Sequence, residues 1–444
     1  MHSQIHTYPG IGEEIQRVQL VRPEDWSELE FFRPEPAEGA FDSFYHIYKE
    51  FLVPAQPWAF GNLVLFRLPA GFQLPQALMR RYAGRVTDPL TVATLALRQG
   101  VTIRGETVRF QDAATRRLWN MLVDADCLRT IQGRLPITSI LPVGDRAGFL
   151  TVSEPEARLK ANASFFIMDP FDCATGYDQI GTPFGLLVKD GVVQQPPLFD
   201  REALLVGQDG SVKIDSPSLE HLRVKIGETI YTHGENARFY SRPEWARTPP
   251  VRHALVIIGT QVVAVCGGST PVPASGFVLC PKEECKVTPG DPVTYQGMED
   301  IRFGIQVGNS ILRDGVQTQT FLSKFYNIRG LQPVPYPPSL YPLDFDNARA
   351  ARMVLGADKD GKPMLLWAEG AAKVGNVPGW DSCGATMADM VRICQELGME
   401  NAIHLDGGGS AQILLKNRRS LYISDRNEDF TQSERPIPLG LIIR

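Results

Sequence analysis

A glycine-rich stretch near the C-terminus combines the residue types best suited to chemistry. The run Ala-Ile-His-Leu-Asp-Gly-Gly-Gly-Ser-Ala-Gln-Ile-Leu-Leu begins at residue 402 and places Asp406 and Ser410 between two apolar segments of strand length. Successive glycine N–H groups in a turn can form an anion-binding nest, although the same glycines are equally typical of a tight hairpin turn. The glycines are Gly407, Gly408 and Gly409.

Two better-known motifs do not fit this stretch. No lysine follows the glycines, and the segment 412–415 is too short and too β-like to open the phosphate-capping helix of a P-loop. Ser410 is not flanked on both sides by a glycine two residues away, which excludes a nucleophile elbow. The elements around the stretch must therefore decide between a nest and a turn.

The composition is that of an ordinary globular protein. A chain of 444 residues can bury a sizeable core, and it predicts two domains or one large domain with an appendage. A hydrophobic content of 43%, a charged content of 21% and a formal net charge of −5 give no electrostatic case for nucleic acid or an anionic membrane. An anionic substrate would need a local basic pocket.

Neither the cysteines nor the first residues indicate export. The seven cysteines include no C-x-x-C pair, which argues against a disulfide framework and against a zinc site. The first residues, Met-His-Ser-Gln-Ile-His, lack the basic and apolar regions of a signal peptide, and no apolar run could span a bilayer. We therefore expect a soluble, cytoplasmic protein without a membrane span; the sequence does not predict its oligomeric state.

Residues 1–150 predict a smaller, partly helical region. Short helices are expected over residues 76–82 and 91–97, and Asp112 can cap a third. A strand is expected over residues 62–68. Because nothing here has the spacing of a chemical site, we expect an accessory or capping domain of mixed α/β structure.

Residues 151–444 predict antiparallel sheets built from hairpins. Pairs of apolar runs flank short turns, and most of these turns contain Asp-Gly, which tolerates the positive φ that hairpin turns require. The turns lie at residues 189–191, 259–260, 313–315 and 359–361. The expected fold class is α+β, with antiparallel-rich mixed sheets and a few packed helices.

One helix in this half is clearly marked. Thr386 and Asp389 form a start like a capping box, apolar residues recur at helical spacing, and Gly398 supplies the stop. This helix would lead directly into the strand that ends at Asp406.

A proline-rich segment at residues 331–343 cannot form a helix or a central strand. The segment is typical of a stiff surface connection. The alternative is a rim over an active site, in which Tyr336 and Tyr341 would stack on a sugar.

Four motifs occur in an order that resembles the phosphodiester glycosidase family. They are Asn-Ala-Ser-Phe-Phe from residue 162, Gly-Thr-Pro-Phe-Gly-Leu-Leu-Val-Lys-Asp-Gly from residue 181, Ala-Arg-Met-Val-Leu-Gly-Ala-Asp-Lys-Asp-Gly from residue 351, and the helix leading into Leu-Asp-Gly-Gly-Gly-Ser. The tripeptide Glu-Arg-Pro follows from residue 434. The resemblance covers about residues 150–444 and implies a hydrolase that cleaves a glycosidic bond to a phosphodiester.

Two positions depart from the family pattern. Ala163 and Ser164 stand where the family has two glycines, and Glu369 stands where the family has an aspartate before glycine. The first change reshapes one wall of the expected site, and the second changes the reach of a carboxylate. A changed substrate and a loss of catalysis are both compatible with these departures.

The resemblance implies chemical roles for three residues. Glycoside hydrolysis commonly uses two carboxyl groups. Asp406 is the first candidate, as nucleophile, base or stabiliser of positive charge on the sugar ring, and Glu369 is the second. Their structural alternatives are turn capping and the end of a surface hairpin. His404 is a candidate acid–base partner of Asp406, although a hydrogen-bonded structural histidine is the commoner case.

Other residues are expected to hold the substrate. Arg352 and Arg435 could bind phosphate as bidentate, permanently charged donors together with the glycine nest, but a salt bridge is an equal alternative for each. Ser410 could hydrogen-bond the phosphate. Asn162 suits sugar hydroxyls or the fixing of its own turn. Phe166 is a candidate pocket wall, since one of the two adjacent phenylalanines should face the site.

No cofactor or metal is predicted. Asp406, Asp381 and Asp389 are hard oxygen donors that leave Ca²⁺ or Mg²⁺ open, but no loop has the spacing of a metal site. The expected partner is a carbohydrate or glycoconjugate substrate, and the family resemblance leaves an envelope or secreted location open as the alternative to the cytoplasm. A non-catalytic glycan- or phosphate-binding protein on the same fold, and an interaction role led by residues 1–150, are the alternatives to a hydrolase.

Overall fold

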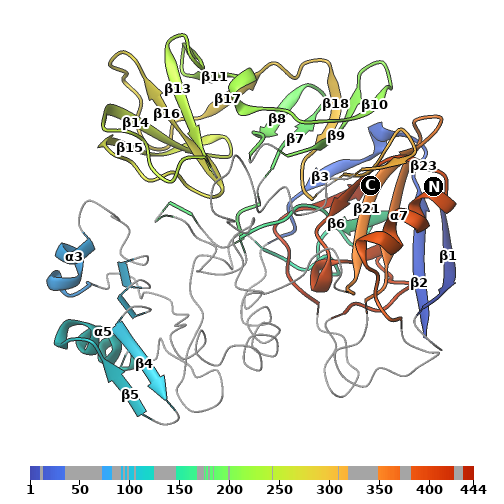
Figure 1. The fold of residues 1–444 in the computed structure, drawn as a ribbon, viewed down its shortest axis with the longest axis horizontal. Coiled ribbons are helices and arrows are strands. Elements are labelled where there is room, and N and C mark those ends of the chain that lie inside the picture. The colour runs from blue at the N-terminus through green and yellow to red at the C-terminus, as the bar shows by residue number, and fades with distance from the viewer. Residues whose placement is uncertain are drawn as a thin grey trace.

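The computed structural model shows a β-rich molecule (Figure 1). It describes residues 1–10, 14–35, 73–82, 92–93, 96–97, 100–104, 107–124, 147–167, 175, 177–178, 181–183, 185–198, 201–242, 244–308, 310–318, 349–370, 382–424 and 434–444. The strand predicted at residues 62–68 and the proline-rich segment with Tyr336 and Tyr341 lie outside the described residues.

A seven-stranded antiparallel sheet carries most of the candidate residues. Its order is β1-β2-β22-β21-β23-β19-β20. In that order the strands are His2–Pro9, Ile15–Arg22, Pro363–Ala368, Arg352–Asp358, Met399–Leu405, Ser310–Arg313 and Val316–Gln317. Strands from both ends of the chain therefore pair with each other, blue beside orange and red in Figure 1.

The second sheet of this part has the order β24-β6-β25-β3. Its strands are Ile413–Leu415, Leu159–Asn162, Gly440–Ile443 and Glu30–Phe32. One buried apolar cluster joins the two sheets, with Trp367 and Leu405 from the first and Ala161 and Leu441 from the second. Burial of this apolar surface is the main force that holds the two sheets together.

The first 35 residues differ from the accessory role expected for residues 1–150. Val18 in β2 pairs with Ala368 in β22, and Leu441 in β25 pairs with Phe31 in β3. These strands complete the two central sheets, because their apolar faces join the same buried core. The division of the rest of the chain at residue 150 stays a prediction.

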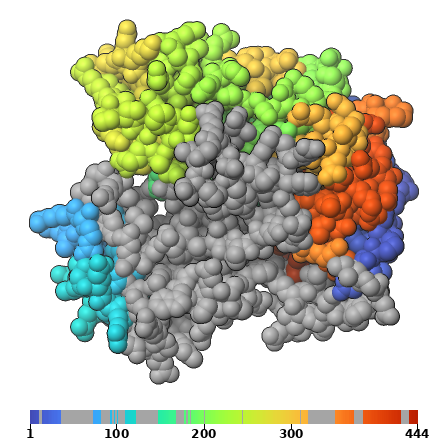
Figure 2. All heavy atoms as spheres, viewed as in Figure 1, coloured from blue at the N-terminus to red at the C-terminus, as the bar shows by residue number. Residues whose placement is uncertain are grey.

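Three further antiparallel sheets form a second β-rich part. Their orders are β10-β9-β18-β7-β8, β12-β11-β17 and β13-β16-β14-β15. Their strands, in chain order from β7 to β18, are Leu187–Lys189, Val192–Gln195, Ala203–Gly207, Val212–Asp215, Arg223–Ile226, Thr229–Thr232, Ala237–Ser241, Val251–Ile258, Gln261–Gly268, Gly276–Pro281, Val293–Gln296 and Ile301–Ile305. In Figure 2 the green and yellow atoms of this part form one continuous surface at the top of the molecule.

The predicted hairpins are present. Each of the four turns joins two paired antiparallel strands. Residues with positive φ lie in every turn, as the Asp-Gly and Gly-Thr sequences predicted. They are Asp190, Gly191, Gly259, Asp314, Gly315 and Gly361.

Helices are few among the described residues. The helix α7 (Met387–Glu396) has the predicted capping box between Thr386 and Asp389, and its buried face packs on the seven-stranded sheet. The predicted helices α3 (Gln76–Tyr82) and α5 (Ala113–Asp124) are also present, beside a hairpin of β4 (Val101–Arg104) and β5 (Thr107–Phe110). The 3₁₀ turns are η1 (Trp26–Glu28), η2 (Leu219–His221) and η4 (Gly408–Ser410). Antiparallel sheets thus dominate more strongly than an α+β label suggests.

None of the helices described is both long and apolar enough to cross a membrane.

Candidate active site

Four strand ends bring the charged candidate residues to one edge of the seven-stranded sheet. Neighbouring strands in the series β2-β22-β21-β23 run in opposite directions, so the starts of β2 and β21 share an edge with the ends of β22 and β23. The residues at this edge are Arg17, Arg352, Glu369 and Asp406. Segments from both ends of the chain therefore build the site.

The glycine turn is fastened to the start of β21. The Gly408 N–H donates to Ala351 O at 2.8 Å, with a Gly408 φ of 58°. A Cβ on Gly407 would lie 2.8 Å from the same Ala351 oxygen, so only glycine permits this approach. The chain then passes through η4 into β24 of the other sheet. The turn links two sheets and is not a hairpin.

The turn's N–H groups argue against the predicted anion nest. The Gly408 N–H is bonded to Ala351 O, and the Gly407 N–H interacts with the Asp406 carboxyl group. One of the three donors expected to face a phosphate therefore has an acceptor within the protein, and a second lowers the pKa of the neighbouring Asp406. Gly407 and Gly408 shape the turn, and phosphate binding by Gly409 stays a prediction.

Asn162 spans the two ends of the turn. Its Nδ2 donates to Asp406 O at 2.6 Å, and its Oδ1 accepts from the Gln412 N–H at 3.0 Å. Both side-chain groups therefore hold backbone on either side of the glycines. These contacts favour the turn-fixing role of Asn162, while contact with a sugar stays a prediction.

Asp406 is a buried carboxyl group with a raised pKa. The residue is 6% exposed, and its Oδ2 has no hydrogen-bond partner among the residues that the structure describes. Burial raises the pKa of Asp406 to about 6, against the lowering effects of the Ser410 hydroxyl, the Arg435 guanidinium and the Gly407 N–H. A carboxyl group that titrates near neutral pH is typical of a catalytic acid or base.

His404 lies near Arg352 and is uncharged. Burial, followed by the positive charge of Arg352, lowers the pKa of His404 to about 3. Among the residues described, none forms a hydrogen bond with its Nε2, and its ring centroid lies 6.3 Å from that of Phe165. So low a pKa makes the imidazole a poor proton acceptor, which argues against the predicted acid–base role at neutral pH. His404 is instead an uncharged polar group beside Arg352 in the candidate site.

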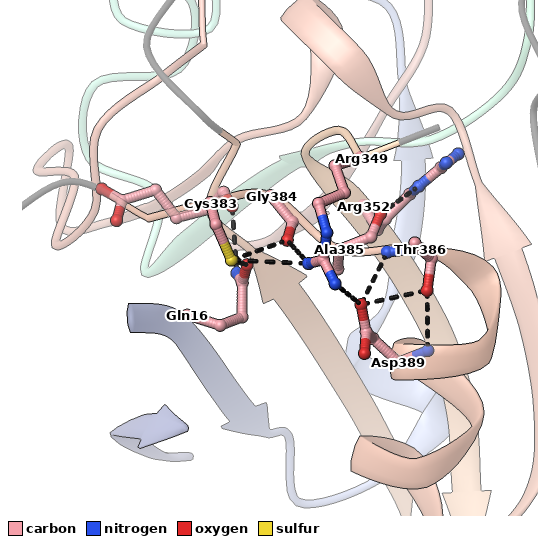
Figure 3. Close-up of polar contacts among 9 residues, drawn as sticks. Gln16, Arg349, Arg352, Cys383, Gly384, Ala385, Thr386 and Asp389 are labelled. Carbon is pink, nitrogen blue, oxygen red and sulfur yellow. Dashed lines mark hydrogen bonds and ion pairs between the residues drawn. The ribbon is translucent and has the colours of Figure 1, made fainter. Parts of the chain in front are cut away.

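Arg352 is buried and held to the segment before α7. Its Nε donates to Ala385 O at 3.0 Å (Figure 3). The nearby Arg349 donates to Gly384 O at 2.7 Å and lies 3.1 Å from the Asp389 carboxylate. These contacts fix the start of β21 relative to the helix cap, so the Arg352 guanidinium is oriented by protein contacts.

Glu369 is a second buried carboxylate, and its oxygens already have partners. Its Oε2 accepts from Arg17 Nε and from Ser382 Oγ, each at 2.6 Å, and its Oε1 accepts from the Tyr422 N–H at 2.8 Å. A carboxylate whose two oxygens are both engaged by such donors has little free capacity to contact a reacting atom. The contacts argue against the catalytic role predicted for Glu369 and favour a positioning role.

The remaining predicted residues are buried as well. Arg435 and Ser410 both lower the pKa of Asp406, and their contact with phosphate stays a prediction. Phe166 forms an isolated bridge with Pro183, whereas the Phe165 ring approaches His404. Phe165 is thus an additional candidate for the pocket wall.

Among the described residues, no three His, Cys, Asp or Glu side chains are grouped so that they could hold a metal ion. Asp389 is engaged by the helix cap and by Arg349, and Asp381 lies outside the described residues. A site without a metal stays a prediction.

Sequence motifs did not reveal several residues at this edge. Arg17, Ser382 and Tyr422 meet around Glu369, although they come from three separate segments. Alternating residues in β2 indicate a strand, but no local signal reveals that β2 pairs with β22. Knowledge of that pairing would have been needed to find Arg17.

The comparisons with known proteins support the family that the order of the motifs predicted. Residues 274–444 match the family model described as phosphodiester glycosidase. A mouse N-acetylglucosamine-1-phosphodiester alpha-N-acetylglucosaminidase is 34% identical over 85 residues, which are 19% of this chain and 15% of that protein. The predicted family resemblance is thus supported over residues 274–444, which are less than half of the chain. The matched segment contains Arg352, Glu369, His404, Asp406 and Arg435, whereas Arg17 and Asn162 lie before it.

Two solved structures show limited similarity. A hypothetical protein from Synechocystis superimposes with a TM-score of 0.43 at 14% identity, over 100% of this chain and 62% of that chain. The zebrafish N-acetylglucosamine-1-phosphodiester alpha-N-acetylglucosaminidase catalytic domain, auto-inhibited by its pro-peptide, gives a TM-score of 0.31 at 14% identity, over 67% of each chain. At these TM-scores the similarity supports no conclusion about the site.

Proposed function

We propose that this protein hydrolyses the glycosidic bond of a sugar 1-phosphodiester. The observation that carries the proposal is Asp406, a buried carboxyl group with a pKa raised to about 6 and an oxygen without a hydrogen-bond partner in the described part of the chain. Leaving a buried acceptor unpaired costs about 1–3 kcal/mol, so such a group is expected where a substrate makes use of it. The family of residues 274–444 supplies the reaction class.

In the proposed reaction, the bond between the anomeric carbon and the phosphate oxygen breaks, and its electron pair leaves with the phosphate. Water supplies a hydroxyl group to the anomeric carbon and a proton to solution, so the products are a free sugar and a phosphomonoester. Ionised Asp406 stabilises the positive charge that develops on the ring and acts as nucleophile or base. Phosphate is a good leaving group, so protonating it matters less than stabilising its charge.

Arg352 and Arg435 are the proposed partners of the phosphate. Both arginines are buried. The charge of Arg352 lowers the pKa of His404, and the charge of Arg435 lowers the pKa of Asp406. A hydrogen bond to a charged group contributes about 1.5–3 kcal/mol. Because Ala385 already orients Arg352, binding would immobilise little additional side-chain freedom.

The test is the release of free sugar from synthetic 1-phosphodiesters of several sugars. We expect Asp406→Asn to lower kcat on the order of 10²–10⁴-fold because it removes the ionised group. Asp360→Asn is a matched control, since it makes the same chemical change in the exposed turn between β21 and β22.

Equal rates for the wild type and the Asp406→Asn protein on every sugar would refute the proposal. Saturable binding in calorimetry without product would instead favour a non-catalytic glycan- or phosphate-binding protein. The altered Ala163-Ser164 wall makes this the second candidate.

A further inference from the structure

Tyr422 is an exposed aromatic residue on an otherwise buried segment. Its residue surface is 45% exposed, whereas Leu421 and Ile423 on either side are 4% and 1% exposed. Both flanking side chains belong to the core between the two central sheets. The backbone that carries the Tyr422 ring is therefore held on both sides by buried apolar contacts.

Two polar contacts fix Tyr422 further. Its N–H donates to Glu369 Oε1 at 2.8 Å, and the guanidinium carbon of Arg17 lies 5.6 Å from the centre of its ring. The same Arg17 is paired with Glu369 at 2.6 Å. A cation over one face of an aromatic ring is attracted by the electron density of that face. Arg17 therefore backs the ring from one side.

A chain of close backbone contacts joins the Tyr422 segment to the glycine turn. A Cβ on Gly370 would collide with the Ser424 hydroxyl and with Ala351 N. The carbonyl of the same Ala351 accepts the Gly408 N–H at 2.8 Å. The segment that carries Tyr422 thus lies against the strand ends that hold the turn after Asp406.

We propose that Tyr422, backed by Arg17, is the surface on which the substrate's sugar ring stacks. The proposal rests on the proposed function and adds a specificity-determining residue to it. A sugar presents C–H groups on its ring faces, and the tyrosine ring offers an apolar face together with a polar hydroxyl group. Because the ring is held by Glu369, Arg17 and the buried neighbours, stacking would order few additional groups.

Glu369 takes a defined part in this arrangement. Its carboxylate holds Arg17 and the Tyr422 N–H simultaneously, which sets the ring relative to the strand edge. Glu369 is therefore a positioning residue for the sugar platform. The N-terminal strand β2 contributes to substrate selection through Arg17, although it lies before the part of the chain that matches the family.

The test is calorimetry on the full chain carrying Asp406→Asn, so that the ligand is not consumed. The probes are methyl phosphodiesters of glucose, mannose and N-acetylglucosamine, with dimethyl phosphate as the probe without a sugar. We expect Tyr422→Leu to weaken binding of the best sugar probe about tenfold and to leave dimethyl phosphate binding unchanged. Tyr422→Phe should bind within about twofold of the parent, because the ring is retained.

Trp245→Leu is the matched control, because Trp245 is also an exposed aromatic residue but lies in the second β-rich part. With Asp406 intact, Tyr422→Leu should raise KM and leave kcat nearly unchanged. Unchanged sugar binding in Tyr422→Leu overturns the platform, as does equal weakening of the sugar and dimethyl phosphate probes. A wild type without turnover whose Asp406→Asn variant binds no probe overturns the proposed function as well.

Discussion

Asp406 and Glu369 follow two strands of the same sheet, with β21 between them, and both carboxyl groups are buried. Glu369 accepts hydrogen bonds from three donors, one of them the charged Arg17. Asp406 retains an oxygen that no described residue hydrogen-bonds, and its pKa is raised to about 6. Burial alone therefore does not distinguish a reactive carboxylate from a structural one.

The difference between these carboxylates lies in how completely the protein compensates for the loss of water. At Glu369 the compensation is nearly complete, so the ion pair and hydrogen bonds hold three segments together. At Asp406 this compensation is partial, so the charged carboxylate is less favourable in the folded protein than in water. Substitutions at the two positions should therefore change stability in opposite directions.

The largest expected effect is at Glu369. We expect Glu369→Ala to lower the free energy of unfolding by about 3–5 kcal/mol, because it leaves Arg17 and the Ser382 hydroxyl without their acceptor. Urea denaturation at neutral pH measures this change. A loss below about 1 kcal/mol would show that Glu369 is not the anchor of this edge.

We expect Asp406→Asn to raise the free energy of unfolding, by a somewhat smaller amount than Glu369→Ala lowers it. The pKa of Asp406 rises from 3.8 to about 6 on folding, so the folded state retains the proton more strongly. Stability of the wild type therefore falls as pH rises from about 4 to 6. The uncharged asparagine removes this dependence and should add about 2–3 kcal/mol at pH 7.

The control for this prediction is the same denaturation experiment on both proteins at acidic pH. Well below the ordinary pKa of 3.8, at about pH 2.5, the wild-type carboxyl group is protonated in both states, so the two proteins should unfold at nearly the same denaturant concentration. Equal stabilities at both pH values would mean that Asp406 does not have a raised pKa.

The pH dependence of the reaction should show the smallest of these effects. If ionised Asp406 is required, kcat/KM should fall about tenfold per pH unit below about 6 and level off above it. His404 has a pKa lowered to about 3 and should add no transition between pH 5 and 8. A rate that instead declines above pH 6 would assign the protonated form of Asp406 to catalysis.

Local sequence rules predicted the individual elements well. The capping box at Thr386 and the turns at Asp190 and Asp314 depend on residues close together in the chain, and all are present. The pairing of β2 with β22 depends on buried surface that only the folded chain creates. The sequence could therefore not reveal that residues 1–35 belong to the central sheets.

The same limit explains the outcome for the candidate site. The motif Leu-Asp-Gly-Gly-Gly-Ser identified Asp406, but not that Ala351 would accept the Gly408 N–H in place of an anion. Glu369 was found from the family resemblance, because it stands where the family has an aspartate before glycine, while its partners Arg17 and Tyr422 come from distant segments. The sequence showed which side chains could take part in chemistry, whereas the protonation and hydrogen bonding of each side chain depended on tertiary contacts.

The pairing of the N-terminal strand with the C-terminal half also constrains how the protein is made. Arg17 and Glu369 are 352 positions apart, so the first strands emerge from the ribosome long before their partners. At a synthesis rate of about 5–20 residues per second, that interval is roughly 20–70 s. During that time the apolar face of β2 lacks its native cover and is open to chaperones or to misfolding. The sheet edge that carries Arg17, Glu369 and Asp406 is therefore among the last features of the nascent chain to form.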